Sequence, residues 1–185
     1  MALKVLNKIN SRLKFLYRKQ NVLNFPLRRL LCNALIQPHF DYACQIWYPN
    51  LTKALSKKMQ CAQNKCVRFC LNLDNRAHLD KKEFKAMNWL PTNERVNQRI
   101  CTSAYNFFNN SPLYMADIFI SNKAIQNTRN SENRFKVPFR KTNIGQHGLS
   151  YTGPMLWNSL SSEIKLSKNR NIFKYKMKLE FFEKS

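Results

Sequence analysis

The sequence has few acidic residues and few glycines. Only 10 of its 185 residues are Asp or Glu, and only 3 are Gly. Metal-dependent polymerases and nucleases need clustered carboxylates to hold two divalent ions. The acids of this chain are dispersed and no two Asp are adjacent. We therefore predict that the chain carries no catalytic residues for phosphoryl transfer.

Long apolar runs are also missing. None approaches the roughly 18 residues needed to cross a bilayer. Lys4 and Lys8 interrupt the N-terminal segment before a secretory signal forms. Six Cys without such a signal are typical of a reducing compartment. We therefore expect an intracellular protein of the nucleus or cytoplasm, with no membrane partner.

Positive charge is present in large excess. The chain has 32 Lys and Arg and a formal net charge of +22, with enough apolar residues (44%) to bury a core. Residues 1–75 hold 13 basic and 2 acidic side chains, residues 76–120 hold 6 and 4, and residues 121–185 hold 13 and 4. Two basic regions favour a polyphosphate partner, because each neutralised phosphate releases counterions. The alternatives are a generically basic soluble protein and a ribosome-like rRNA binder.

Apolar residues recur at helical spacing along most of the chain, which predicts a mainly α fold. The first three helices should form an antiparallel bundle with short connections. Pro38 should end or kink the second helix, Asp41 to Tyr48 is a further helical candidate, and Thr92 is expected as an N-cap. The predicted helices cover about residues 3–20, 26–38, 51–71, 80–88 and 93–109, a short segment to about 120, and the C-terminal segment.

Two of these helices have distinct apolar faces. In the second helix the apolar stripe is Leu27, Leu30, Leu31, Ala34 and Leu35. In the third helix the buried seam is predicted to be Leu55, Met59, Ala62, Cys66, Phe69 and Cys70.

Helical periodicity fades after residue 122. We expect an irregular or short-strand segment around 123–152, with Phe135–Phe139 and Leu149–Tyr151 as the strand candidates. The predicted organisation is a basic helical bundle (1–75), a neutral helical connector (76–121) and a basic C-terminal extension with a terminal helix (122–185).

Three patterns resemble catalytic or ligand sites, and each has a simpler interpretation. Cys61, Cys66 and Cys70 followed by His78 lack the spacing of zinc ligands, and free Cys packs as a small hydrophobe. His39 and Asp41 have no nucleophile nearby, so a structural contact is favoured. The glycines at 145, 148 and 153 lack the Lys-Ser/Thr of a phosphate loop and favour a turn-rich connector.

Five strings, taken in order, resemble one known family. They are LIQPHFDYACQIW at 35–47, MQCAQNKCVRFCL at 59–71, Trp89-Leu90-Pro91 followed by Arg95, SPLYM at 111–115 and GPMLWNSL at 153–160. Together they resemble the C-terminal part of non-LTR (LINE-type) retrotransposon reverse transcriptases of the jockey and CR1-like groups. That part follows the catalytic palm of an RNA-directed DNA polymerase.

The resemblance implies a thumb-like bundle over residues 1–75, followed by a post-thumb extension. The family's palm with its Tyr/Phe-x-Asp-Asp site and its endonuclease are not in the sequence, and Leu160-Ser161 replaces the usual Leu-Pro. We therefore expect a fragment of a longer polyprotein. Because Mg²⁺ would belong to the palm, we expect no cofactor, no metal and no small-molecule substrate on this chain.

The resemblance also implies that the thumb packs against a primer–template duplex. We predict a non-catalytic segment that binds template RNA or RNA–DNA hybrid, and the alternative is a module that docks on a polymerase palm domain. We expect the Trp side chains at 47, 89 and 157 to lie in the core rather than to stack on bases. The candidate phosphate contacts are Lys8, Arg12, Lys14, Arg18, Lys19, Arg28, Arg29, Lys57, Lys58, Lys65, Arg68, Arg129, Arg134, Arg140 and Lys141.

Overall fold

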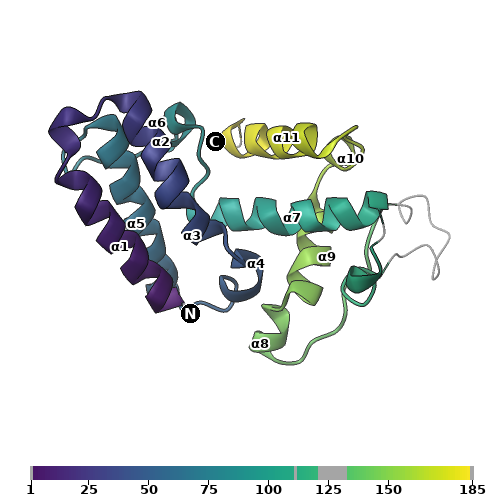
Figure 1. The fold of residues 1–185 in the computed structure, drawn as a ribbon. Helices are drawn as coiled ribbons and strands as arrows, with labels where there is room; N and C mark the ends of the chain where they lie inside the picture. The colour runs from purple at the N-terminus through teal and green to yellow at the C-terminus, as the bar shows by residue number, and fades with distance from the viewer. Residues whose placement is uncertain (1, 111, 121–132, 184–185) are drawn as a thin grey trace. The chain divides into compact units, whose positions relative to one another are not determined.

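The computed structural model describes residues 2–110, 112–120 and 133–183. These residues are mainly helical and include no β-strand, which confirms the predicted mainly α class (Figure 1). The chain divides into two compact units, Met1–Val96 and Asn97–Ser185. The boundary falls inside helix α7 (Thr92–Asn110), and so within the segment 76–121 predicted as a connector. No helix in the described residues is long and apolar enough to cross a membrane.

The first unit is built on α1 (Ala2–Tyr17), α2 (Phe25–Leu35) and α5 (Lys53–Leu71), which pack together (Figure 1). A short 3₁₀ turn, η1 (Gln20–Val22), links the first two helices. The predicted seam of α5 is buried, apart from Leu55, which is half-buried. On α1 the buried residues are Ala2, Leu6, Ile9, Leu13 and Leu16.

The orientation of α2 contradicts the sequence-based expectation. Asn24 caps the helix by accepting the Leu27 backbone N–H, and Pro26 occupies its first turn. The predicted apolar stripe is exposed or half-buried, whereas the buried residues of α2 are Arg28 and Cys32. The helix is instead rotated so that Cys32 faces the α5 thiols and Arg28 reaches carbonyl groups in the bundle.

Two short helices follow α2, where the sequence predicted one helical run from Asp41 to Tyr48. They are α3 (Gln37–Asp41) and α4 (Cys44–Trp47). Ala43 separates them because it adopts a left-handed backbone conformation with φ of 47°, which an α-helix cannot contain. Trp47 is half-buried and its indole N–H donates to the Tyr42 carbonyl.

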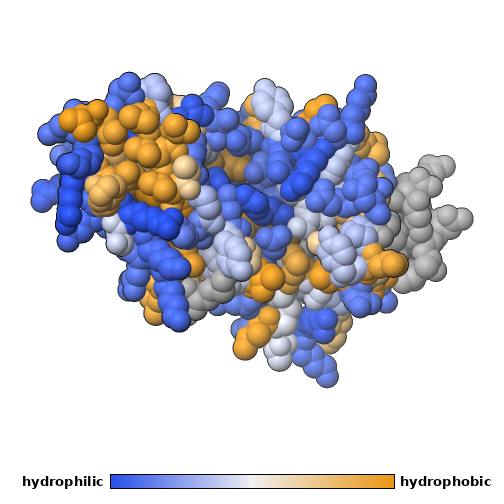
Figure 2. All heavy atoms as spheres, viewed as in Figure 1, coloured by the Kyte–Doolittle hydropathy of each residue, from blue (hydrophilic) through white to orange (hydrophobic). Residues whose placement is uncertain are grey.

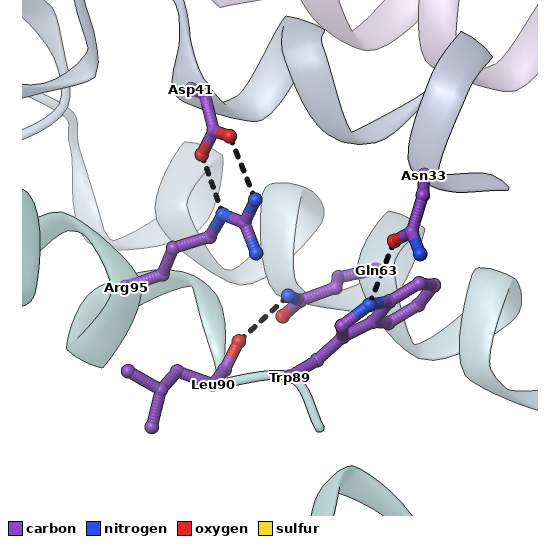
Figure 3. Close-up of polar contacts among 6 residues, drawn as sticks. All are labelled: Asn33, Asp41, Gln63, Trp89, Leu90 and Arg95. Atoms are coloured by element: carbon purple, nitrogen blue, oxygen red, sulfur yellow. Dashed lines mark hydrogen bonds and ion pairs between the residues drawn. The ribbon is translucent and has the colours of Figure 1, made fainter. Parts of the chain in front are cut away.

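Polar contacts join Trp89, Leu90 and the first turn of α7 to α2, α3 and α5 (Figure 3). The Trp89 indole N–H donates to Asn33 at 3.0 Å, and the Gln63 amide donates to the Leu90 carbonyl at 2.8 Å. Arg95 binds both carboxylate oxygens of Asp41, at 2.6 and 2.7 Å. These contacts hold the Trp89–Arg95 segment in the first unit, after the short helix α6 (Lys81–Met87).

Thr92 is the first residue of α7, and the residue before the helix is Pro91. The Arg95 backbone N–H donates to the Pro91 carbonyl, and the Thr92 hydroxyl donates to the Gln60 side chain at 2.7 Å. The predicted N-cap role of Thr92 is therefore wrong, because its hydroxyl is oriented toward α5 by a tertiary hydrogen bond.

The second unit surrounds an aromatic core. After the end of α7 come η2 (Leu113–Met115), α8 (Asn143–Gln146), α9 (Leu149–Ser159), α10 (Ser162–Lys165) and α11 (Arg170–Glu183). Trp157 of α9 is fully buried and donates its indole N–H to the Asn133 carbonyl. The buried cluster comprises Cys101, Ala104, Tyr105, Phe119, Phe135, Trp157, Ile164 and Phe173.

The expected short strands are replaced by other structure in the described residues. Leu149–Tyr151 is the first turn of α9, and 143–146 forms α8. Phe135 lies in an extended segment, but its backbone N–H and carbonyl both bind the Asn158 side chain, at 3.0 and 2.8 Å. An asparagine thus satisfies the backbone groups that a neighbouring strand would pair. Residues 123–132 of the predicted segment lie outside the described residues.

Candidate nucleic-acid interface

A groove in the first unit lies between α1 and α5, the two helices drawn side by side in Figure 1. Its volume is about 460 Å³. The C-terminal parts of the two helices lie close together. The Tyr17 hydroxyl donates to the Lys65 carbonyl at 3.2 Å, and just beyond the helices the Gln20 amide donates to the Asn72 side chain at 2.8 Å. Lining residues come from α1, from α5 and from the loop after it, and they are Asn10, Leu13, Lys14, Tyr17, Lys65, Arg68 and Asn75.

The groove brings together three of the predicted phosphate contacts, Lys14, Lys65 and Arg68. Both lysines are exposed, and Arg68 is half-buried. The Arg68 Nε–H donates to the Ala77 carbonyl at 2.9 Å, which fixes the side chain and uses one of its five N–H donors. A fixed guanidinium and two extended ammonium groups around one concave surface are suited to binding phosphate oxygens.

Tyr17 forms a wall of the groove and was missed by the sequence-based prediction. Its ring meets Phe69 edge-on at 5.1 Å, and its hydroxyl donates to the Lys65 carbonyl at 3.2 Å. Burial raises the pKa of this phenol, so it remains a neutral hydrogen-bonding group. Asn10, Lys14 and Tyr17 are spaced four and three apart on one helix face, which is the signal that would have placed them together.

The part of the chain that forms this groove has few acids. Residues 1–75 contain two, Asp74, which precedes the groove residue Asn75, and Asp41. The carboxylate of Asp41 is committed to Arg95, and both side chains are about one-fifth exposed. Residues 1–75 therefore hold 13 basic side chains against these two acids, of which one is already paired. An anionic ligand would supply the missing negative charge.

The other predicted contacts of the first unit do not line the groove. Lys8 and Arg12 act on His39 of α3, lowering its pKa together with burial, which is the larger cause. Arg12 also donates to the Leu35 carbonyl at 2.6 Å. Exposed positions elsewhere on the unit are Arg18, Lys19, Lys57 and Lys58, and Arg29 is half-buried.

Arg28 is not available as a phosphate contact. The residue is only 9% exposed, and its guanidinium donates to the Gln20 carbonyl at 3.1 Å and the Phe69 carbonyl at 3.4 Å. The guanidinium carbon also lies 5.9 Å from the centre of the Phe69 ring. The prediction that Arg28 contacts nucleic acid is therefore wrong, because backbone carbonyls and an aromatic face hold its charge inside the bundle.

The basic residues predicted in the second unit are dispersed. Arg140 and Lys141 are exposed just before α8, and the Gln146 side chain donates to the Arg140 carbonyl. Arg134 is exposed and its charge lowers the pKa of Lys165, for which burial is the larger cause. Arg129 lies outside the described residues.

Two of the three cysteines considered as zinc ligands are core residues, as predicted. Cys66 and Cys70 are fully buried, and Cys61 is exposed. Contact with the Cys32 thiol and burial raise the pKa of Cys66. A buried thiol with a raised pKa does not supply the thiolate that metal binding requires.

Comparisons of the chain with protein families, with curated proteins and with solved structures found no match. The strings that carry the family resemblance can be located in the structure. Asp41 from the first string binds Arg95, and Gln63 from the second binds Leu90. Met115 and Trp157, from the last two strings, pack in the core of the second unit. The strings therefore include residues that stabilise each unit.

Proposed function

We propose that this chain binds RNA or RNA–DNA duplex through the groove between α1 and α5, as a non-catalytic part of a reverse transcriptase. The observation that carries the proposal is the gathering of Lys14, Lys65 and Arg68 around one groove. Of the two acids in residues 1–75, Asp41 is bound to Arg95 and Asp74 accepts the Arg76 backbone N–H, so positive charge is in large excess around the groove. Contacts of this kind recognise the backbone and carry no sequence specificity.

The reverse-transcriptase part of the proposal is supported by the five strings, whose order and approximate spacing follow the C-terminal part of that family. In that family the thumb binds the duplex behind the growing end of the DNA. The high positive charge of this chain suits binding to a duplex, and its dispersed carboxylates suit a role without catalysis. DNA synthesis itself is assigned to a palm domain, so the role proposed for this chain is to hold the template.

Fluorescence anisotropy with a labelled RNA–DNA hybrid across a salt series tests this function. The variant Lys14→Gln, Lys65→Gln, Arg68→Gln removes the groove cations. A charge-matched control is Lys53→Gln, Lys82→Gln, Lys85→Gln, because these exposed residues lie at the start of α5 and on α6. The slope of log K against log salt is expected to fall by about two to three in the groove variant only.

Two results would contradict the proposal. One is an affinity of the unmodified chain that stays flat between 50 and 200 mM salt. The other is an equal loss of slope in the groove variant and the charge-matched control, which would assign binding to overall charge. Circular dichroism spectra of both variants establish that each remains folded.

One observation favours docking on another protein as a second candidate function. The outer face of α2 exposes Leu27 (40%), Leu30 (61%) and Leu35 (37%), and Val22 before the helix is 78% exposed. Figure 2 shows apolar side chains gathered over this part of the first unit. Contiguous apolar surface of this kind is typical of interaction sites, and a polymerase palm domain is the partner that the resemblance implies.

Leu30→Glu separates the two candidates. If α2 docks on a palm domain, this substitution should abolish co-purification with a palm-containing polypeptide while leaving hybrid binding unchanged. Asn21→Glu is the matched control, because it adds the same single negative charge at an exposed polar residue of η1. Unchanged co-purification of the Leu30 variant would argue against the docking surface.

A further inference from the structure

A second groove lies wholly within the second unit, between the end of α7 and the start of α11. Its volume is about 500 Å³, within the range of sites that hold small ligands. None of the predicted nucleic-acid contacts within the described residues lines it. Its residues are Tyr105, Asn106, Asn109, Asn110, Pro112, Tyr114, Lys168, Asn169 and Arg170.

Side-chain amides dominate this groove, in contrast to the cationic one of the first unit. Asn109 donates through its NH₂ group to the Tyr105 carbonyl, a bond that does not use its own side-chain oxygen. Asn169 accepts the Ile172 N–H through its side-chain oxygen, a bond that does not use its NH₂ group. An amide presents a donor and an acceptor together, which is the pattern of a nucleobase edge.

The two tyrosines of the groove have different roles. Tyr105 is buried, stacks on Phe173 with ring centres 4.5 Å apart and donates its hydroxyl to the Ser167 carbonyl. It therefore forms a rigid floor. Tyr114 at the rim is 80% exposed, and it offers a flat aromatic face on which an unpaired base can stack.

Two cations complete the groove. Lys168 and Arg170 are both exposed and flank Asn169. Neither has an ion pair or a side-chain hydrogen bond within the described residues. Their position beside the amides and the exposed ring places phosphate-binding groups next to groups that can recognise a base.

We propose that this groove takes one unpaired nucleotide of single-stranded RNA. Tyr114 stacks on the base, the asparagine amides bind its edge, and Lys168 and Arg170 bind its phosphate. Base edges and faces are open in this way only outside a duplex. The inference rests on the proposed function in one respect, that the ligand is nucleic acid. It differs in assigning single strands to this groove and duplex to the groove between α1 and α5.

Binding of a labelled six-nucleotide single-stranded RNA by the full chain tests the proposal. The background is the variant Lys14→Gln, Lys65→Gln, Arg68→Gln, so that the first groove does not contribute. Tyr114→Ala is expected to weaken binding about tenfold, as loss of one stacked base does. Tyr175→Ala is the matched control, because this tyrosine of α11 is also exposed (62%) and lies outside the groove.

The phosphate contacts are tested by Lys168→Gln with Arg170→Gln, compared with Lys82→Gln with Lys136→Gln, which removes two exposed cations that line neither groove. The first pair should lower the salt slope by about one to two, and the second should leave it unchanged. An equal or larger loss in the second pair would place the phosphate contacts outside this groove and overturn the proposal.

The remaining outcomes separate this proposal from the proposed function. Equal weakening of single-stranded RNA binding by Tyr114→Ala and Tyr175→Ala would overturn the second groove alone. Weakening of duplex binding by Tyr114→Ala to the same extent as single-strand binding would also overturn it. A normal Tyr114 effect together with an unchanged salt slope in the Lys14, Lys65 and Arg68 variant would overturn the first groove and leave the second standing.

Discussion

The guanidinium of Arg28 lies inside the first unit, against Phe69, donating to its carbonyl at 3.4 Å and facing its ring at 5.9 Å. A residue expected on a phosphate-binding surface thus connects α2 to α5. Removal of this side chain should affect stability more than nucleic-acid binding.

We expect Arg28→Ala to lower the free energy of unfolding by about 2–3 kcal/mol, because it leaves a cavity and unpaired carbonyl groups. Arg28→Met keeps an apolar stem of similar length and should cost less. Urea unfolding measures both. Neither variant should change the salt slope of hybrid binding, and a slope reduced by about one would return Arg28 to the phosphate contacts.

The two-fold contact between Asp41 and Arg95 gives a second prediction. Asp41→Asn should destabilise the first unit by about 2 kcal/mol, because a partly buried guanidinium loses its charge partner. Asp74→Asn is the control. Among the described residues, its exposed side chain accepts one hydrogen bond, from the Arg76 backbone N–H, which an amide oxygen can also accept. Equal effects of the two substitutions on the urea midpoint would contradict this role of Asp41.

Gly153 of α9 packs directly against Phe119. A β-carbon added at this position would lie 2.7 Å from the ring. Gly153→Ala should therefore destabilise the second unit by about 1–3 kcal/mol through overpacking. Phe119→Leu should relieve the clash, so the double variant should be more stable than the sum of the single effects predicts. Additive effects in thermal unfolding would show that the ring is not the obstacle.

His39 makes the stability of the first unit depend on pH. Burial and the charges of Arg12 and Lys8 lower its pKa, and its buried Nε2 has no partner among the described residues. The unfolded chain therefore binds this proton more readily than the folded chain does. The contribution of His39 to stability is complete above its ordinary pKa of about 6.5 and is lost as the pH falls through the lowered value.

Urea unfolding at pH 7.5 and pH 5.5 measures this effect. His39→Gln should lose less stability between the two values than the unmodified chain. His147→Gln, at an exposed position after α8, should lose as much as the unmodified chain. If the His39 variant shows the same loss, other groups account for the acid sensitivity.

The sequence by itself determined the mainly α class, the position of most helices and the buried seam of α5. These features follow from local periodicity and from breakers such as Pro26, which act over a few residues. The same local information predicted the groove cations Lys14, Lys65 and Arg68 as exposed, but it did not group them, because residues 14 and 65 are brought together only by the packing of α1 on α5.

Only the tertiary structure decided which face of α2 is buried and which partner hydrogen-bonds the backbone N–H and carbonyl of Phe135. A wide apolar stripe identifies an amphipathic helix but does not choose its neighbour, and here Arg28 and Cys32 face the bundle. Phe135 has its backbone paired by Asn158, 23 residues later in the chain. Both outcomes depend on partners distant in sequence, which no local pattern specifies.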